Sequence, residues 1–168
     1  MHTKLHWIDG PWQGRLAIAA RPRGGDWIED EISGWQQEGE EAVVSLLTPA
    51  ELVDLSLECE ESACRSRGMA YMNFPIEDRT FPVSDAAAAS LVDEVIALLR
   101  SGKNVVAHCR QGVGRASLIG IAALLHEGTN LDAAIREVGR ARGVPVPETA
   151  GQRDWLRHFE SLRYHVAR

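Results

Sequence analysis

The sequence has no apolar run long enough to cross a membrane, and it contains little cysteine. Its hydrophobic stretches all fall short of the roughly 20 residues that a spanning helix needs, and residues 1–4 lack the apolar block of a signal peptide. Three cysteines, an odd number, form no disulfide framework and fit a reducing compartment. We therefore expect a cytoplasmic protein with no membrane partner.

The sequence also lacks an excess of positive charge. Its 18 Lys and Arg residues are outnumbered by 24 Asp and Glu residues, for a net charge of −6, which argues against general nucleic-acid binding. The histidines, Cys59 and Cys64 have no spacing typical of metal ligands, so we expect no metal. With 45% hydrophobic residues, the 168-residue chain fits a single domain over residues 1–168.

The hydrophobic pattern alternates between short strand-like runs and helical stripes. The expected strands are 5–8, 14–20, 42–47, 69–74 and 104–108, and the expected helices are 26–37, 48–67, 84–102, 115–126, 131–142 and 152–165. Residues 1–25 then form an N-terminal strand pair and loop. This order predicts an α/β domain with a mostly parallel central sheet of about five strands and helices on both faces.

Residues 104–117 contain a strand, a glycine-rich loop and the start of a very apolar helix. Gly112 and Gly114 permit a tight loop whose backbone N–H groups turn inward. The positive end of the helix dipole adds to the positive potential inside that loop. A thiolate at Cys109 would be stabilised there and would be a good nucleophile. Arg115 offers a planar pair of donors to two oxygens of a phosphate.

The pattern His108-Cys109-x5-Arg115 resembles the His-Cys-x5-Arg signature of the cysteine-dependent protein tyrosine and dual-specificity phosphatases. The resemblance implies that Cys109 is the nucleophile and that His108 supports the loop. It also implies a phosphate-binding loop formed by Arg110, Gln111, Gly112, Val113, Gly114 and Arg115.

Residues 116 and 117 depart from this family pattern. The family has a serine or threonine directly after the arginine, and its hydroxyl helps the cysteine leave from the phosphocysteine. This sequence has Ala116 there, followed by Ser117 as a supporting hydroxyl.

Cleavage of a phosphate ester also needs an acid for the departing oxygen, on a loop that can close over the substrate. Asp78 lies 31 residues (109 − 78) before Cys109, and its loop leaves the same end of the sheet. Residues 74–82 resemble the Pro-Ile-x-Asp-x3-Pro form of the cyclin-dependent-kinase-associated phosphatase branch, a resemblance that extends over residues 34–160. Asp78 is therefore the expected general acid, with Glu77 as the alternative, and Gln152 matches the family glutamine that positions the attacking water.

The resemblance implies hydrolysis of phosphate monoesters on proteins or peptides through a phosphocysteine, by a monomer without a cofactor. Phosphotyrosine is the expected substrate, and action on phosphoserine or phosphothreonine stays open. Arg110 is the only additional base between Cys109 and Arg115, which favours a protein substrate over a phosphoinositide. Two alternatives remain open: a phosphate-binding pseudophosphatase, suggested by Ala116, and a sulfurtransferase or arsenate reductase, which would not need Asp78.

Overall fold

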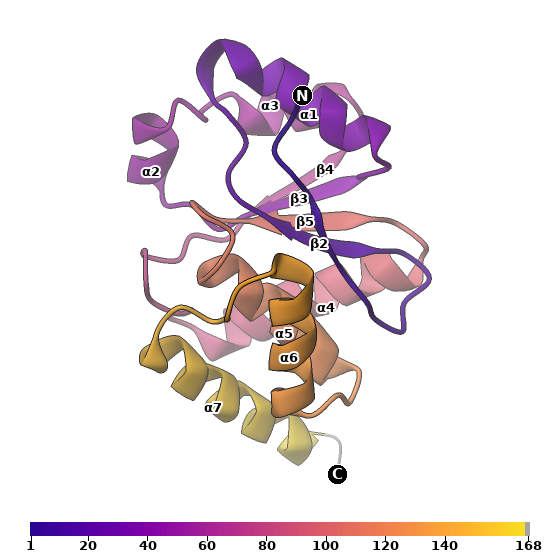
Figure 1. The fold of residues 1–168 in the computed structure, drawn as a ribbon, viewed down its shortest axis with the longest axis vertical. Helices are drawn as coiled ribbons and strands as arrows, with labels where there is room; N and C mark the ends of the chain where they lie inside the picture. Colours follow the sequence, from indigo (N-terminus) through magenta and orange to yellow (C-terminus); the bar gives the residue numbers. More distant parts are fainter. Residues whose placement is uncertain (167–168) are drawn as a thin grey trace.

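The computed structural model describes the backbone of residues 1–166 and the side chains of residues 1–162. A five-stranded sheet crosses the middle of the molecule in the order β1-β2-β5-β3-β4 (Figure 1). Its strands are β1 (His6–Ile8), β2 (Leu16–Ala19), β3 (Ala42–Ser45), β4 (Ala70–Asn73) and β5 (Val105–His108). Only β1 is antiparallel to its neighbour, which confirms the predicted mostly parallel sheet.

Helices cover both faces of the sheet (Figure 1). The short helix η1 (Gly25–Trp27), α1 (Ile28–Gln37) and α3 (Glu60–Ser66) lie on one side, and α2 (Pro49–Asp54) lies near the edge where the parallel strands end. The other side carries α4 (Asp85–Arg100), α5 (Arg115–His126), α6 (Leu131–Arg142) and α7 (Ala150–Val166). The described residues therefore form a single three-layered α/β domain.

Successive residues of β5 face opposite layers, as the pleat of a strand requires. Val105 and Ala107 belong to the core shared with α4–α7, whereas Val106 belongs to the core shared with α1 and α3. His108 continues the Val106 side, where its ring lies 5.9 Å from that of Trp35, and Cys109 continues the Ala107 side. The pleat thus directs these two neighbouring side chains into different layers.

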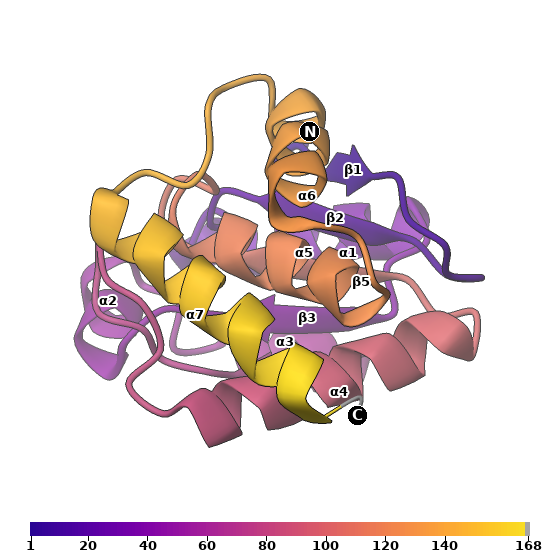
Figure 2. The ribbon, with the colours of Figure 1, turned by 90° about the horizontal axis from the view of Figure 1, so that it is seen from below.

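Helix α5 is the central helix of its layer, as its apolar sequence predicted. Eleven of its twelve residues are buried, and it contacts α4, α6, α7 and strands β2 and β5. Figure 2 shows it behind α6 and α7, against the sheet. This packing holds the N-terminus of α5, and the loop before it, in a fixed position relative to the strand ends.

The prediction of one helix over residues 48–67 was wrong, because the helix breaks between α2 and α3. A capping box begins α2: the Thr48 hydroxyl accepts from the Glu51 N–H, and the Glu51 carboxylate accepts from the Thr48 N–H. The chain then turns at Ser56, whose φ of +56° is left-handed. The Gly25 N–H donates to the Ser56 carbonyl at 2.8 Å, and a Cβ on Gly24 would lie 2.1 Å from the Leu55 carbonyl oxygen. Close packing of this loop stabilises a break that neither glycine nor proline marks.

Other sequence predictions held with small shifts at the ends of elements. Ser84 and Asn130 cap α4 and α6 through their side chains, at the predicted starts of these helices. The helix predicted over residues 26–37 begins at Ile28, because residues 25–27 form the short η1 turn, which leaves Trp27 54% exposed. No helix in the described part of the chain is both long and apolar enough to span a bilayer.

Candidate active site

A pocket of about 130 Å³ opens at the edge of the sheet where the parallel strands end, on the left in Figure 1. Three segments form it: the loop after β4, the loop between β5 and α5, and the loop before α7. The residues that line it are Asp78, Arg79, Cys109, Arg110, Gln111, Gly114, Arg115 and Glu148. The pocket thus brings together the three residues predicted to be catalytic.

The loop before α5 depends on Gly112. Its φ is +71°, and a Cβ there would lie 2.5 Å from the carbonyl carbon of Ala19, so a larger residue does not fit. The outer side of the loop is held by Arg142 of α6, whose guanidinium donates to the Gln111 and Gly112 carbonyls at 3.2 Å each. The Arg110 carbonyl accepts from the Arg21 N–H at 3.3 Å. These carbonyls point outward, which leaves the N–H groups of the loop free to face inward.

The Cys109 sulfur lies inside this ring of N–H groups. Its Sγ accepts from the backbone N–H of Gly112 at 3.3 Å and from that of Ala116 at 3.4 Å, and the residue is only 3% exposed. Both donors and the N-terminus of α5 stabilise negative charge on sulfur. The anion-binding loop that the glycines predicted is therefore formed, and the thiol lies at its base.

Arg115 is fixed by a carboxylate of the short helix α2. Glu51 accepts from both Nη atoms of Arg115, at 2.8 and 2.9 Å, and the Ile76 carbonyl accepts from Nη1 at 2.8 Å. Burial tends to raise the pKa of Glu51, but the hydrogen bonds from Arg115 and from the Thr48 N–H outweigh it and hold the pKa at about 2. Glu51 stays ionised and keeps the guanidinium facing the pocket.

Asp78 reaches the pocket from the loop after β4. One carboxylate oxygen lies 3.1 Å from Nη2 of Arg115, and the side chain is 54% exposed toward the opening. Arg79, the next residue, adopts a left-handed φ of +64°, and the Thr80 N–H closes a turn onto the Glu77 carbonyl. Asp78 lines the pocket and Glu77 does not, so the geometry favours Asp78 of the two candidate acids.

Gln152 and Ser117 lie near the pocket but are not among the residues that line it. The buried Gln152 side chain accepts from the N–H groups of Glu148 and Thr149, at 3.0 and 3.1 Å, and donates to the Thr80 carbonyl at 3.0 Å. It joins the start of α7 to the loop that carries Asp78. The Ser117 hydroxyl donates to the Gly114 carbonyl at 2.7 Å, so it supports the loop and does not bond to Cys109.

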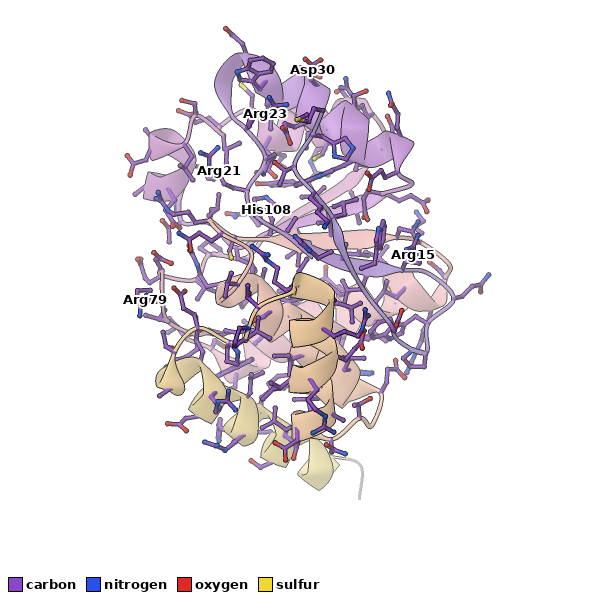
Figure 3. All side chains as sticks on the ribbon, in the orientation of Figure 1. Arg15, Arg21, Arg23, Asp30, Arg79 and His108 are labelled. Carbon is purple, nitrogen blue, oxygen red and sulfur yellow. The ribbon has the colours of Figure 1, made fainter. Side chains whose placement is uncertain are left out.

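Glu148 is a pocket residue that the sequence analysis did not select. Its carboxylate pairs with Arg79 at 3.0 Å, and a Cβ on Gly114 would lie 2.9 Å from its other oxygen. Figure 3 shows Arg79 at the outer edge of the molecule. One carboxylate and one guanidinium from different loops therefore meet at the pocket opening.

His108 also has a partner that the sequence did not predict. Its Nε2 lies 2.5 Å from Oε1 of Glu60 on α3, and both side chains are fully buried. Figure 3 shows His108 in the interior, on the side of the sheet that α1 and α3 cover. Glu60 reaches this position only because α3 begins after the break at residues 55–59.

The remaining cysteines lie apart from Cys109. Cys59 is exposed, and Cys64 is buried in the α1/α3 core, across the sheet from Cys109. Burial raises the pKa of Cys64 to about 12, so this thiol stays protonated. Among residues 1–162, no three His, Cys, Asp or Glu side chains are grouped as ligands for a metal.

Comparison with known families identifies this arrangement. Residues 17–129, about two thirds of the chain, match the model of Tc-R-P, described as a polymorphic toxin system DSP-PTPase phosphatase. The chain belongs to this DSP-PTPase phosphatase family. A comparison with curated proteins gave no match.

Solved structures of phosphatases share the fold of this DSP-PTPase family member. Kinase associated phosphatase (KAP), with its catalytic cysteine changed to serine, has a TM-score of 0.83 at 18% identity, covering 96% of each chain. Tk-PTP in its active form has a TM-score of 0.77 at 29% identity, covering 94% of this chain and 96% of its own. PTPMT1 has a TM-score of 0.80 at 18% identity and 98% coverage of both chains. The family and the fold agree with the resemblance drawn from residues 34–160.

Proposed function

We propose that this DSP-PTPase family member hydrolyses phosphate monoesters of protein side chains through a phosphocysteine on Cys109. One observation carries the proposal: the Cys109 sulfur accepts two backbone N–H groups at the base of a pocket that Arg115 and Asp78 also line. A nucleophile, an oxyanion cradle and an acid in one pocket are the components that phosphate-ester cleavage needs.

In the first step, the Cys109 thiolate attacks phosphorus and the bond between phosphorus and the ester oxygen breaks. The N–H groups of the loop and the Arg115 guanidinium bind the phosphate oxygens, and Asp78 gives its proton to the departing oxygen. In the second step, a water attacks phosphorus, the S–P bond breaks, and Asp78 takes a proton from the water. No metal or organic cofactor is needed, because positioning and electrostatics supply the catalysis.

The charges at the pocket opening favour a substrate with a single phosphate. Three arginines and two carboxylates line the pocket, and each arginine already pairs with a carboxylate: Arg79 with Glu148, Arg110 with Glu51, and Arg115 with Glu51 and Asp78. A second phosphate beside the first would meet a carboxylate. PTPMT1 has been solved in complex with PI(5)P, but the proposed substrate here is a phosphorylated tyrosine, serine or threonine side chain.

The test measures release of p-nitrophenol from p-nitrophenyl phosphate in EDTA, from pH 5 to 8, for the wild type, Cys109→Ser and Asp78→Ala. We expect metal-free activity that disappears in Cys109→Ser. With phosphopeptides, whose leaving groups need protonation, we expect Asp78→Ala to lose most of its activity. Binding of phosphate without turnover by the wild type would instead support a pseudophosphatase. Turnover only with thiosulfate or arsenate would support the sulfur-transfer alternatives, and faster release from PI(5)P than from peptides would overturn the substrate class.

A further inference from the structure

We propose that Glu60 is a positioning residue for the nucleophile: acting through His108, it fixes the carbonyl of Cys109 and thereby the direction of the Cys109 side chain. This inference rests on the proposed function only in taking Cys109 as the reacting group. Glu60 lies on α3, on the side of the sheet opposite the Cys109 side chain, and it does not line the pocket.

His108 and Cys109 are linked through the backbone at the end of strand β5. His108 is the last residue of β5, and Cys109 follows it directly, with the two side chains on opposite sides of the sheet. Their backbones share one planar peptide unit, which has no free rotation of its own. A rotation of the backbone at residue 108 therefore also changes the direction of the Cys109 side chain relative to the N–H groups of Gly112 and Ala116.

The two contacts of the His108 ring require two protons. Both ring nitrogens face oxygen acceptors: Nε2 faces Oε1 of Glu60 at 2.5 Å, and Nδ1 faces the Cys109 carbonyl at a longer 3.5 Å. A neutral imidazole carries only one N–H. Both contacts are favourable only when Nδ1 holds one proton and a second proton lies between Nε2 and Oε1 of Glu60. In that state the pair has no net charge.

The surroundings agree with a neutral pair. Both side chains are completely buried, where an uncompensated charge would be very unfavourable. The second carboxylate oxygen of Glu60 has no hydrogen-bond partner, so His108 is the group that compensates Glu60. Cys64 and Tyr71 lie near Glu60, and burial together with the Glu60 charge raises the pKa of both, so these side chains keep their protons.

Loss of Glu60 would change which nitrogen of His108 carries the proton that faces the Cys109 carbonyl. A neutral His108 ring with no partner at Nε2 can place its proton on either nitrogen. With the proton on Nε2, the Nδ1 lone pair would face the Cys109 carbonyl oxygen and repel it. The second proton, which Glu60 shares with Nε2, removes this alternative, because Nε2 is then satisfied without taking the proton from Nδ1. The carboxylate therefore keeps the Nδ1 proton on the Cys109 carbonyl.

The direct test is the protonation of the His108 ring in the wild-type protein, measured by ¹⁵N–¹H NMR of protein labelled with ¹⁵N-histidine. We expect a proton on Nδ1 of His108 in the folded protein. A neutral ring with its only proton on Nε2 would overturn the proposal, whatever the variants do and whether or not the protein is an active phosphatase.

The variants test the consequence for Cys109. Glu60→Met keeps the approximate size but removes the acceptor, Glu60→Gln keeps a hydrogen bond, and Glu31→Gln serves as the matched control. Glu31 on α1 is also fully buried, but it pairs with Arg23 of the preceding loop, outside the pocket. We expect Glu60→Met to slow alkylation of Cys109 by iodoacetate about tenfold or more, the size of effect that one hydrogen bond to a charged group supports. Glu60→Gln should recover part of the rate.

The alkylation rate and the split between kcat and KM together separate positioning from a merely structural role. The alkylation is followed by mass spectrometry at the peptide that contains Cys109, because the exposed Cys59 also reacts. In turnover of p-nitrophenyl phosphate, kcat should fall while KM stays near the wild-type value, because Arg115 and the loop N–H groups still bind the phosphate. A folded Glu60→Met protein with wild-type alkylation rate and kcat would overturn the proposal, as would equal losses in Glu31→Gln. If Glu60→Met does not fold, the NMR measurement and Glu60→Gln still decide.

Discussion

The pair between Glu51 and Arg115 makes the stability of the protein depend on pH in a way that Glu51→Gln should remove. Glutamine keeps the size of the side chain and can still serve in a capping box. It cannot match the two charged hydrogen bonds that Glu51 accepts from Arg115 at 2.8 and 2.9 Å. The variant therefore isolates the negative charge of Glu51 from its role at the start of α2.

The size of the effect follows from the pKa of Glu51, which falls from 4.5 to about 2 in the folded protein. A depressed acid pKa stabilises the folded state at any pH above 4.5, and that stability is lost as the pH falls toward 2. The shift of about 2.5 units corresponds to roughly 3 kcal/mol at pH 7 and roughly 1.4 kcal/mol at pH 3. Removal of one partner of a buried pair costs about 3–5 kcal/mol in other proteins, which agrees with this value.

The assay is urea unfolding of wild type and Glu51→Gln at pH 7 and pH 3. The difference in free energy of unfolding between the two proteins should be more than halved at pH 3. Glu61→Gln is the control, because Glu61 forms an exposed pair with Arg65 on α3 and should contribute less than about 1 kcal/mol. A difference that is the same at both pH values would refute the reasoning, because the charge of Glu51 would then not be the source of the stability.

Three other changes have defined outcomes. Burial, with the charge of Glu38, raises the pKa of Glu40 to about 8. The free energy of unfolding of the wild type should therefore fall by about 2 kcal/mol between pH 6 and 8. Urea unfolding of Glu40→Gln should show no such decline. Gly112→Ala places a Cβ 2.5 Å from the Ala19 carbonyl carbon and should lower the unfolding temperature and abolish vanadate binding. A variant with the unfolding temperature and the vanadate affinity of the wild type would contradict this prediction. Ala116→Ser puts a hydroxyl on the residue whose N–H already reaches Sγ and should speed decay of the phosphocysteine in rapid-quench experiments without changing its formation. An unchanged decay rate would show that the residue at position 116 does not limit this step.

The strands, the central helix and the loop around Cys109 could be predicted because their signals are local. Glycines at 112 and 114, an apolar run on each side and a fixed spacing to Arg115 all lie within a few residues of one another. The three acidic residues Glu51, Glu60 and Glu148 could not be assigned to the site in this way. Their roles depend on the helix break after α2 and on the approach of the loop before α7, which are set by packing between distant segments.

Glu60 illustrates the difference most clearly. In the sequence it stands among Glu58 and Glu61, and nothing distinguishes it from a solvated residue. In the structure it is fully buried against His108. A sequence signal would have required knowing that the chain turns at Ser56, where no glycine or proline is present. The left-handed turn is stabilised by contacts with residues 24–25, about 30 positions earlier in the chain.

The opposite orientation of His108 and Cys109 also bears on how the activity could be changed by selection. The sheet is one layer of backbone thick, so only this layer separates the residues of α3 from the pocket. A mutant library restricted to the pocket lining would omit Glu60 and its neighbours Ala63 and Cys64, which pack in the opposite core. Selection for faster turnover from a library that covers the whole chain should therefore enrich substitutions on α3, and their effects should depend on the residue present at position 108.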